Sequence, residues 1–447
     1  MTKNKILTTV MIFVLFYGIN LVANSKPNLY GFKNHTILSV SDADMVASAY
    51  TNGKLGKKEG KDVFSIIDFD NTLNSYTKVE VPASNSVAGP PSVLAVDPSG
   101  KYVYIIETFK QRPKNNQEHT FKDLPIGNHL IIFDVSNPKK PQLLSKTVIQ
   151  DRPESVAINF DGTLLTVSFY PNKKKDIKPI ALYKIEKGLV KEVYYPNINE
   201  DKTNRLISTS WHPSKNILAV INQTKAEVSF YHVDNKNISL KLWGNKVSVG
   251  KSPFIGKFTK DGKHILINNL FWGADVEGKW NEAPNGTIVN IALDVNKSSK
   301  KIRHALTSQV MVGPSPEGFT VSLEGDYVVS ANMERSWLPF NDSRQNWFSS
   351  LSLIKRDITT GALNMMHTVP YDGILPEALV FDSSTDYLAV ATFDHYDEKI
   401  EGGSIDFFRK VSDPLNPEKE MLMKMRNSIP VTRGVHSMVL IDKNKKH

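Results

Sequence analysis

Short runs of alternating apolar and polar residues recur along the chain as a hairpin pattern. Its clearest copy, in residues 316–339, reads PEGFTVSLEGDYVVSANMERSWLP, where two apolar runs flank a Glu-Gly-Asp turn and a polar loop follows. Further copies begin at Pro91, Glu154, Leu206, Pro253 and Glu377, with a degenerate copy at His35 and a half copy at Val435. Alternation with a period of two, bounded by Gly, Pro, Asn and Asp, predicts antiparallel strands.

Two further strand-like runs separate consecutive copies. After the copy at Pro91 they are HLIIFDVS and PQLLSKTVI, and after the copy at Glu154 they are IALYKIE and VKEVYYP. Each unit thus holds four short strands in roughly 50 to 60 residues, which is typical of a β-propeller blade. We expect an all-β fold: a seven-bladed β-propeller in a single domain, residues 26–447, with four antiparallel strands per blade. The N-terminal strands and HSMVLID should share one blade and close the ring, with either HTILSV or HSMVLID innermost.

The repeat resembles that of a known group of proteins. The copy at Pro91 has Pro-x-x-apolar followed by Asp-Pro-Ser-Gly-Lys-Tyr-Val-Tyr. This pattern is similar to that of the YVTN-type seven-bladed propellers, which include lactonase-like proteins related to 6-phosphogluconolactonase. The resemblance covers almost the whole chain after residue 25 and implies the fold. It does not select an activity, because the group contains hydrolases, binding proteins and surface proteins.

The first residues have the layout of an export signal. MTKNK supplies a basic start, ILTTVMIFVLFYGINLV an apolar stretch, and Ala23 and Ser25 a small-x-small site. This layout predicts a signal peptide over residues 1–25. A retained single-pass anchor is the alternative, because the apolar run is near the short limit for a membrane span. We expect an exported, periplasmic or extracellular protein that is soluble after cleavage and monomeric.

Composition narrows the possible chemistry. The 447 residues include no cysteine, which argues against c-type haem, iron–sulfur and blue-copper sites. No Gly-rich phosphate loop is present, so a nucleotide signature is also lacking. Lys and Arg number 55 against 46 Asp and Glu, a net charge of +9. The excess is dispersed in short runs, which we interpret as a solvated basic surface rather than a nucleic-acid interface.

The two ends of the hairpins differ in loop length. Turns inside the hairpins are short, whereas the loops that leave the second strand are long, as in residues 107–128, 333–347 and 394–403. These long loops share a face with the start of each innermost strand, and binding sites are usually built from variable loops on a rigid scaffold. On this face we expect a small-molecule, glycan or protein ligand, with Arg335, Trp337, Trp347 and His395 as candidate contacts. His395, within the run DHYDE, is alternatively part of a solvated acidic loop.

One position in each copy, five residues before the turn, should face the mouth of the central channel. This position holds Ser92, Glu154, Ile207, Phe254, Glu317, Glu377 and His436. Carboxylates gathered in one place raise one another's pKa unless a cation is near. The cation could be a divalent ion, Ca²⁺, Mg²⁺ or Mn²⁺, held by Glu154, Glu317 and Glu377. It could instead be the guanidinium of Arg152, Arg335 or Arg433.

These residues support two hypotheses about function. The first is binding without turnover, in which Glu154, Glu317, Glu377 and His436 contact the ligand together with the loop residues. The alternative is a lactone or ester hydrolase at the channel mouth, with Glu317, Glu377, His436 and Arg433 as candidate catalytic residues. Arg or His would stabilise the oxyanion while Glu or a metal-bound water attacks the carbonyl. Against both stands a structural role, in which each Glu accepts hydrogen bonds from backbone N–H groups where its strand begins.

Overall fold

The computed structural model describes residues 30–71, 75–89, 92–114, 118–172, 175–198, 200–271, 284–295, 301–396 and 401–444. The predicted signal peptide, residues 1–25, lies outside this part of the chain. Among the described residues, no helix has the length and apolar character needed to cross a membrane.

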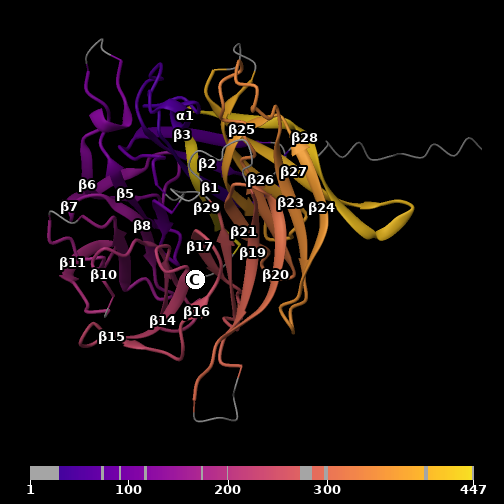
Figure 1. The fold of residues 1–447 in the computed structure, drawn as a ribbon. Coiled ribbons are helices and arrows are strands. Elements are labelled where there is room, and N and C mark those ends of the chain that lie inside the picture. Colours follow the sequence, from indigo (N-terminus) through magenta and orange to yellow (C-terminus); the bar gives the residue numbers. More distant parts are fainter. Residues whose placement is uncertain are drawn as a thin grey trace, which may run out of the picture.

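Seven antiparallel sheets follow one another around the molecule, as the colours in Figure 1 show. Blade 1 contains β1 (His35–Ser41), β2 (Val63–Phe69), β3 (Tyr76–Pro82) and β29 (Val435–Asp442). Blade 2 contains β4 (Leu94–Val96), β5 (Tyr102–Phe109), β6 (Ile126–Asp134) and β7 (Gln142–Val148). Blade 3 contains β8 (Pro153–Ile158), β9 (Leu164–Phe169), β10 (Ile180–Glu186) and β11 (Leu189–Tyr194).

The second half of the ring continues the pattern. Blade 4 contains β12 (Leu206–Trp211), β13 (Ile217–Asn222), β14 (Glu227–Asp234) and β15 (Ser239–Leu242), with the short β16 (Val247–Ser248) also paired to β14. Blade 5 contains β17 (Pro253–Phe258), β18 (His264–Asn269), β19 (Asn285–Ala292) and β20 (Ala305–Pro314). Blade 6 contains β21 (Pro316–Val321), β22 (Tyr327–Asn332), β23 (Ser349–Arg356) and β24 (Leu363–Tyr371). Blade 7 contains β25 (Gly373–Phe381), β26 (Tyr387–His395), β27 (Gly403–Asp413) and β28 (Asn416–Val431).

The C-terminal strand closes the ring as its innermost strand in blade 1. The strand order there is β29-β1-β2-β3, and β29 runs antiparallel to β1 with Ile37 opposite Leu440. β29 also contacts β25 of blade 7 on one side and β4 of blade 2 on the other. The predicted seven-bladed fold and its closure are therefore confirmed, and HSMVLID, not HTILSV, is innermost.

The short turns have a common construction that explains the recurrent sequence pattern. In blade 2 the Asp97 carboxylate accepts hydrogen bonds from the backbone N–H groups of Lys101 and Tyr102, at 2.8 and 2.6 Å. The same bond to the residue five positions later is made by the side chains of Asn159, Thr259, Ser322 and Asp382. A short polar side chain at this position therefore holds the turn between the first and second strands of a blade.

Burial differs between the inner and outer strands of each blade. Strands such as β13 and β22 are buried on both faces, whereas the outer strand β7 exposes most of its residues. Inner strands are covered by the two neighbouring blades, so they read as continuous apolar runs. This is why the hairpin of the first two strands repeats recognisably and the outer strands do not. β27 and β28 are longer than the other strands and project from blade 7 (Figure 1).

Candidate functional site

A cavity of about 330 Å³ lies where the innermost strands begin, on the face of the long loops. Its residues come from blades 2 to 7 and from α1 (Ala49–Asn52) and η1 (Phe121–Asp123). The lining residues are Tyr50, Val87, Ala88, Gly89, Phe109, Phe121, Arg152, Arg205, Gln223, Phe254, Leu270, Glu317, Met333 and Leu375. We call this space the loop-side cavity. Its walls are mainly apolar, with two arginines and one carboxyl group.

Glu154 pairs with Arg205 from the next blade. The Glu154 side chain is fully buried, and its Oε2 and Oε1 accept hydrogen bonds from Nε and Nη2 of Arg205 at 2.9 and 2.5 Å. Burial alone would lower the pKa of Arg205, but the neighbouring Glu154 carboxylate more than offsets this and raises it. Glu154 thus has a guanidinium partner, one of the two kinds of partner expected from the sequence, although Arg205 was not among the arginines considered.

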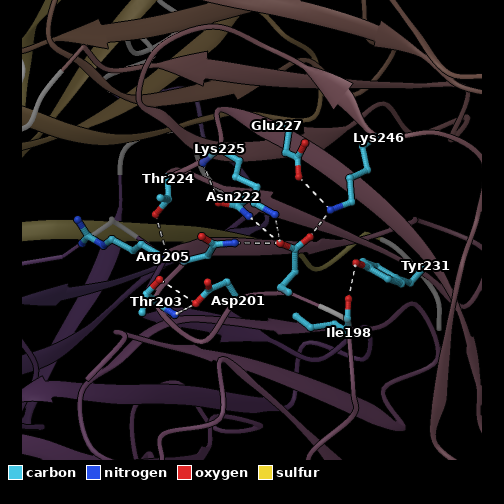
Figure 2. A network of polar contacts seen from close by, with 12 residues as sticks. Ile198, Asp201, Thr203, Arg205, Asn222, Thr224, Lys225, Glu227, Tyr231 and Lys246 are labelled. Atoms are coloured by element: carbon cyan, nitrogen blue, oxygen red, sulfur yellow. Dashed lines mark hydrogen bonds and ion pairs between the residues drawn. The ribbon is translucent and has the colours of Figure 1, made fainter. Parts of the chain in front are cut away.

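The backbone that carries Arg205 is held by a polar network between blades 3 and 4. The buried Glu200 carboxylate accepts hydrogen bonds from the side chains of Asn222, Lys225 and Lys246. The backbone N–H of Arg205 donates to Thr224 Oγ1 at 2.8 Å. Figure 2 shows these contacts, with the Arg205 side chain pointing away from Lys246. The network fixes the strand start from which Arg205 reaches the cavity.

Arg152 stacks on aromatic rings beside that ion pair. Its guanidinium carbon lies 3.6 Å from the centroid of the Tyr170 ring and 5.1 Å from that of Phe109. Its Nε has no hydrogen-bond acceptor among the described residues. Burial lowers the pKa of Arg152, which Glu154 partly opposes. Two guanidiniums therefore share the single Glu154 carboxylate at this wall, which leaves one positive charge uncompensated.

Glu317 and Glu377 are buried at the bottom of the site on adjacent inner strands. Burial raises the pKa of Glu317 to about 8. Burial, then the charges of Glu317 and Asp42, raise the pKa of Glu377 well above its ordinary value. Neither carboxyl oxygen of Glu377 has a hydrogen-bond partner within the described part of the chain. The two glutamates thus lie close enough for the charge of Glu317 to act on Glu377, but only Glu317 lines the loop-side cavity, and Glu377 borders a separate hollow.

His436 is buried and is hydrogen-bonded to the side-chain amide of Asn85. Its Nε2 lies 2.8 Å from Asn85 Oδ1, and the Asn85 amide nitrogen donates to the carbonyl oxygens of Ser41 and Ala83. That orientation makes Oδ1 an acceptor, so Nε2 of His436 carries the proton. Burial lowers the pKa of His436 to about 3. A neutral, amide-bound imidazole can orient a neighbour but is a poor general acid.

Three of the remaining predicted residues line a second hollow on the same face, and Arg335 and Trp347 do not line it. This groove, of about 840 Å³, lies between blades 6, 7 and 1 and is bordered by Trp337, His395 and Arg433. Arg433 donates to the carbonyl oxygen of Lys57 and lies 3.6 Å from Glu59.

The two tryptophans of the blade 6 loop differ in exposure. Trp337 is buried, whereas Trp347 is 54% exposed and stacks on Phe340, with 5.6 Å between the ring centroids. Arg335 lies in the same loop, where its carbonyl oxygen accepts from Leu338. The predicted contacts therefore separate into two places.

The residues predicted to hold a metal do not form one cluster. Glu154 is paired with Arg205. Within the described ranges, the one set of three carboxylates whose oxygens lie within 4.8 Å of one another is Asp42, Asp44 and Asp62. These aspartates accept hydrogen bonds from backbone N–H groups, and Lys58 lies 2.8 Å from Asp44. Such bonding fits a role in holding the loop between β1 and β2.

The arginines occupy equivalent positions that the sequence alignment could have reached. Arg152 and Arg205 each stand two residues before the aligned channel position of their blade, as Leu375 does in blade 7. All three line the loop-side cavity. Reading the alignment two residues further upstream would have identified Arg205.

Comparisons with known proteins agree on the fold. No family model matches the sequence, and no curated protein matches it significantly. The periplasmic gluconolactonase of Pseudomonas aeruginosa is 14% identical, with a TM-score of 0.58 over 91% of this chain and 99% of that protein. A candidate 6-phosphogluconolactonase of Bacteroides fragilis is also 14% identical, with a TM-score of 0.58 over 91% of this chain and 98% of that one. A Lactobacillus plantarum protein is 12% identical, with a TM-score of 0.57 over 91% and 99%. At these identities the likeness is one of fold: this chain is a seven-bladed propeller like the lactonase-like proteins.

Proposed function

We propose that the chain is a binding protein whose loop-side cavity takes a small organic anion. The observation that carries the proposal is Arg152, a guanidinium that is stacked on Tyr170 and whose Nε has no hydrogen-bond acceptor in the described chain. Phe109, Phe254 and Leu270 make the rest of the wall apolar. A few placed polar groups in an apolar cavity of this size are typical of small-molecule sites.

A carboxylate suits this arrangement for two reasons. A guanidinium can donate two parallel hydrogen bonds to a carboxylate, and such charge-assisted bonds are about twice as strong as neutral ones. The ring under Arg152 holds the guanidinium flat, so little side-chain freedom is lost when the anion binds. The apolar walls then favour a ligand that joins the carboxylate to an aromatic or aliphatic group.

We further infer that the protein is exported, so that the ligand is met outside the cytoplasm. The support is the sequence of residues 1–25, with its basic start, apolar stretch and small-x-small site. The groove beside Trp337 and Arg433 offers a second place on this face, where a glycan or a protein would bind.

Lactone hydrolysis is the second candidate, because Glu317 and Arg152 line the same cavity. A pKa of about 8 suits Glu317 to general-base catalysis near neutral pH. Glu317 would take a proton from a water molecule while the oxygen of that water attacks the lactone carbonyl carbon. Arg152 would stabilise the oxyanion that forms. When the ring C–O bond breaks, Glu317 would return the proton to the leaving oxygen. The likeness to a gluconolactonase suggests the substrate class to try.

Thermal-shift and calorimetric titrations with benzoate and gluconate test the binding proposal, with benzamide as the uncharged control. Benzoate should stabilise the wild type at millimolar concentration and benzamide should not. Arg152→Gln should abolish the benzoate shift, whereas Lys260→Gln, an exposed cation in the turn of blade 5, should leave it unchanged. No shift with either anion would refute the proposal. Turnover of glucono-δ-lactone that Glu317→Gln abolishes would establish the hydrolase instead.

A further inference from the structure

The innermost strands of blades 6 and 7, β21 and β25, are in contact, and they carry Glu317 and Glu377. A Cβ built on Gly318 would lie 2.0 Å from the backbone oxygen of Glu377, so only glycine permits this contact. The Asn268 amide nitrogen donates to the carbonyl oxygens of Pro316 and Glu317, at 2.6 and 2.8 Å, and fixes the start of β21. The backbone thus places Glu317 and Glu377 beside each other.

Two cations border the hollows around this pair, Arg152 with Glu317 and the partly buried Lys257 with Glu377. Among the described residues, neither forms an ion pair with Glu317 or Glu377. The Glu377 side chain is 0% exposed, and neither of its carboxyl oxygens has a donor from the described residues. The groups that interact electrostatically with the pair are Tyr50 from α1 and Asp42 from the β1–β2 loop. Tyr50 is an un-ionised phenol and Asp42 is an acid, so neither supplies a positive charge. Arg205 is held by Glu154 on the opposite wall. Two buried carboxylates without a counter-charge cannot both stay ionised.

We propose that their buried setting without a paired cation keeps both Glu317 and Glu377 protonated near neutral pH, and that the neutral carboxyl group of Glu317 is a specificity-determining hydrogen-bond donor to the anion in the loop-side cavity. This inference rests on the proposed anion site and deepens it. The O–H of Glu317 and the guanidinium of Arg152 give the cavity donors from two walls, which selects a ligand with several acceptor oxygens. Ionised Glu317 would repel the same ligand and remove one donor.

A pH series of benzoate affinity tests the proposal, because benzoate remains ionised throughout it. If only the protonated form of Glu317 binds and its pKa is about 8, the dissociation constant should rise about tenfold between pH 7 and 9. Glu317→Gln should bind benzoate with no such dependence. Glu377→Gln should leave the midpoint near pH 8, because burial, and not the charge of Glu377, raises the pKa of Glu317. The exposed Glu324→Gln should behave as wild type.

Infrared difference spectra provide a readout that does not need the ligand. Wild type at pH 7 should have a protonated-carboxyl C=O band that Glu317→Gln and Glu377→Gln each reduce and Glu324→Gln does not. Benzoate that binds with the same affinity at pH 7 and 9 would overturn the proposal. If benzoate does not bind at any pH, the anion site fails, and the infrared band alone decides whether Glu317 and Glu377 are protonated.

Discussion

The carboxylate of Glu154 is bound on two sides by the guanidinium of Arg205, at 2.9 and 2.5 Å, across the boundary between blades 3 and 4. Glu154 is fully buried and the Arg205 side chain is 28% exposed. The pair therefore joins two blades and at the same time forms one wall of the loop-side cavity. Because the Glu154 carboxylate is bonded to Arg205, the neighbouring guanidinium of Arg152 remains available for a ligand.

Replacing Glu154 by Gln should destabilise the protein by roughly 3 kcal/mol, because the change leaves Arg205 without a counter-charge at a mostly buried site. Urea unfolding monitored by fluorescence measures this. The control is Glu324→Gln, which removes an exposed pair with Lys260 at 3.5 Å and should cost no more than about 0.5 kcal/mol. Equal losses in the two variants would contradict a structural role for the Glu154–Arg205 pair.

The two tryptophans of the blade 6 loop should respond very differently to truncation. Trp337 is 2% exposed, and Trp347 rests on Phe340 at the surface. Trp337→Ala should cost about 3 to 5 kcal/mol, as expected when a large core side chain is removed. Trp347→Ala should cost less than about 1 kcal/mol, because surface substitutions usually have small effects. Chemical unfolding of both variants gives the comparison, and similar losses would mean that Trp347 is packed in solution.

The same two tryptophans illustrate what the sequence could establish. The hairpin repeat predicted the fold, the number of blades and the face of the long loops, because inner strands buried on both sides must be apolar and their turns need a short polar residue. The burial of Trp337 could not be predicted, since it depends on how loops from different blades pack. Arg205 was missed because it lies in the connection before a strand, and Glu200 because no repeat contains it.

The aligned position of the repeats does not have one common chemistry, and the sequence did not determine the partners of its residues. Alignment placed Glu154, Glu317, Glu377 and His436 together, yet their partners differ: an arginine for Glu154, another carboxyl group for Glu317, and an amide for His436. Those partners come from segments far away in the chain. An alignment of the repeats identifies which residues share a position in the blades. Their protonation and pairing depend on side chains that only the folded structure brings near them.

Gly434 should be far less tolerant of a methyl group than Gly60. Both have left-handed φ angles, +81° and +75°, so alanine carries a similar backbone strain at each. A Cβ at Gly434 would lie 1.9 Å from the Asp42 carbonyl oxygen, whereas one at Gly60 would have nothing within 4 Å. Gly434→Ala should therefore cost about 1 to 3 kcal/mol more than Gly60→Ala. Melting temperatures report the difference, and equal values would argue that the closing strand β29 is loosely held.

His436 should make the fold sensitive to mild acid. Its pKa is about 3 in the folded protein and about 6.5 in an unfolded chain. The unfolded state therefore binds the proton first as pH falls below about 6.5, and folding stability is lost from there down to about pH 3. Between pH 6.5 and 5 the loss from this residue is about 1.6 kcal/mol.

Asp42 acts in the opposite direction in part of this range. Its pKa is raised to about 6, first by burial and then by Asp44, so the folded state takes up its proton more readily and gains stability as pH falls through 6. Other buried groups, such as His264, whose pKa burial lowers to about 4, also contribute to the slope for the wild type, so a variant is needed to isolate His436. His436→Gln keeps an amide donor for Asn85 but cannot titrate. From pH 7.5 to 5 it should lose about 2 kcal/mol less than the wild type in urea unfolding, and parallel losses would mean that His436 is accessible to protons in the folded state.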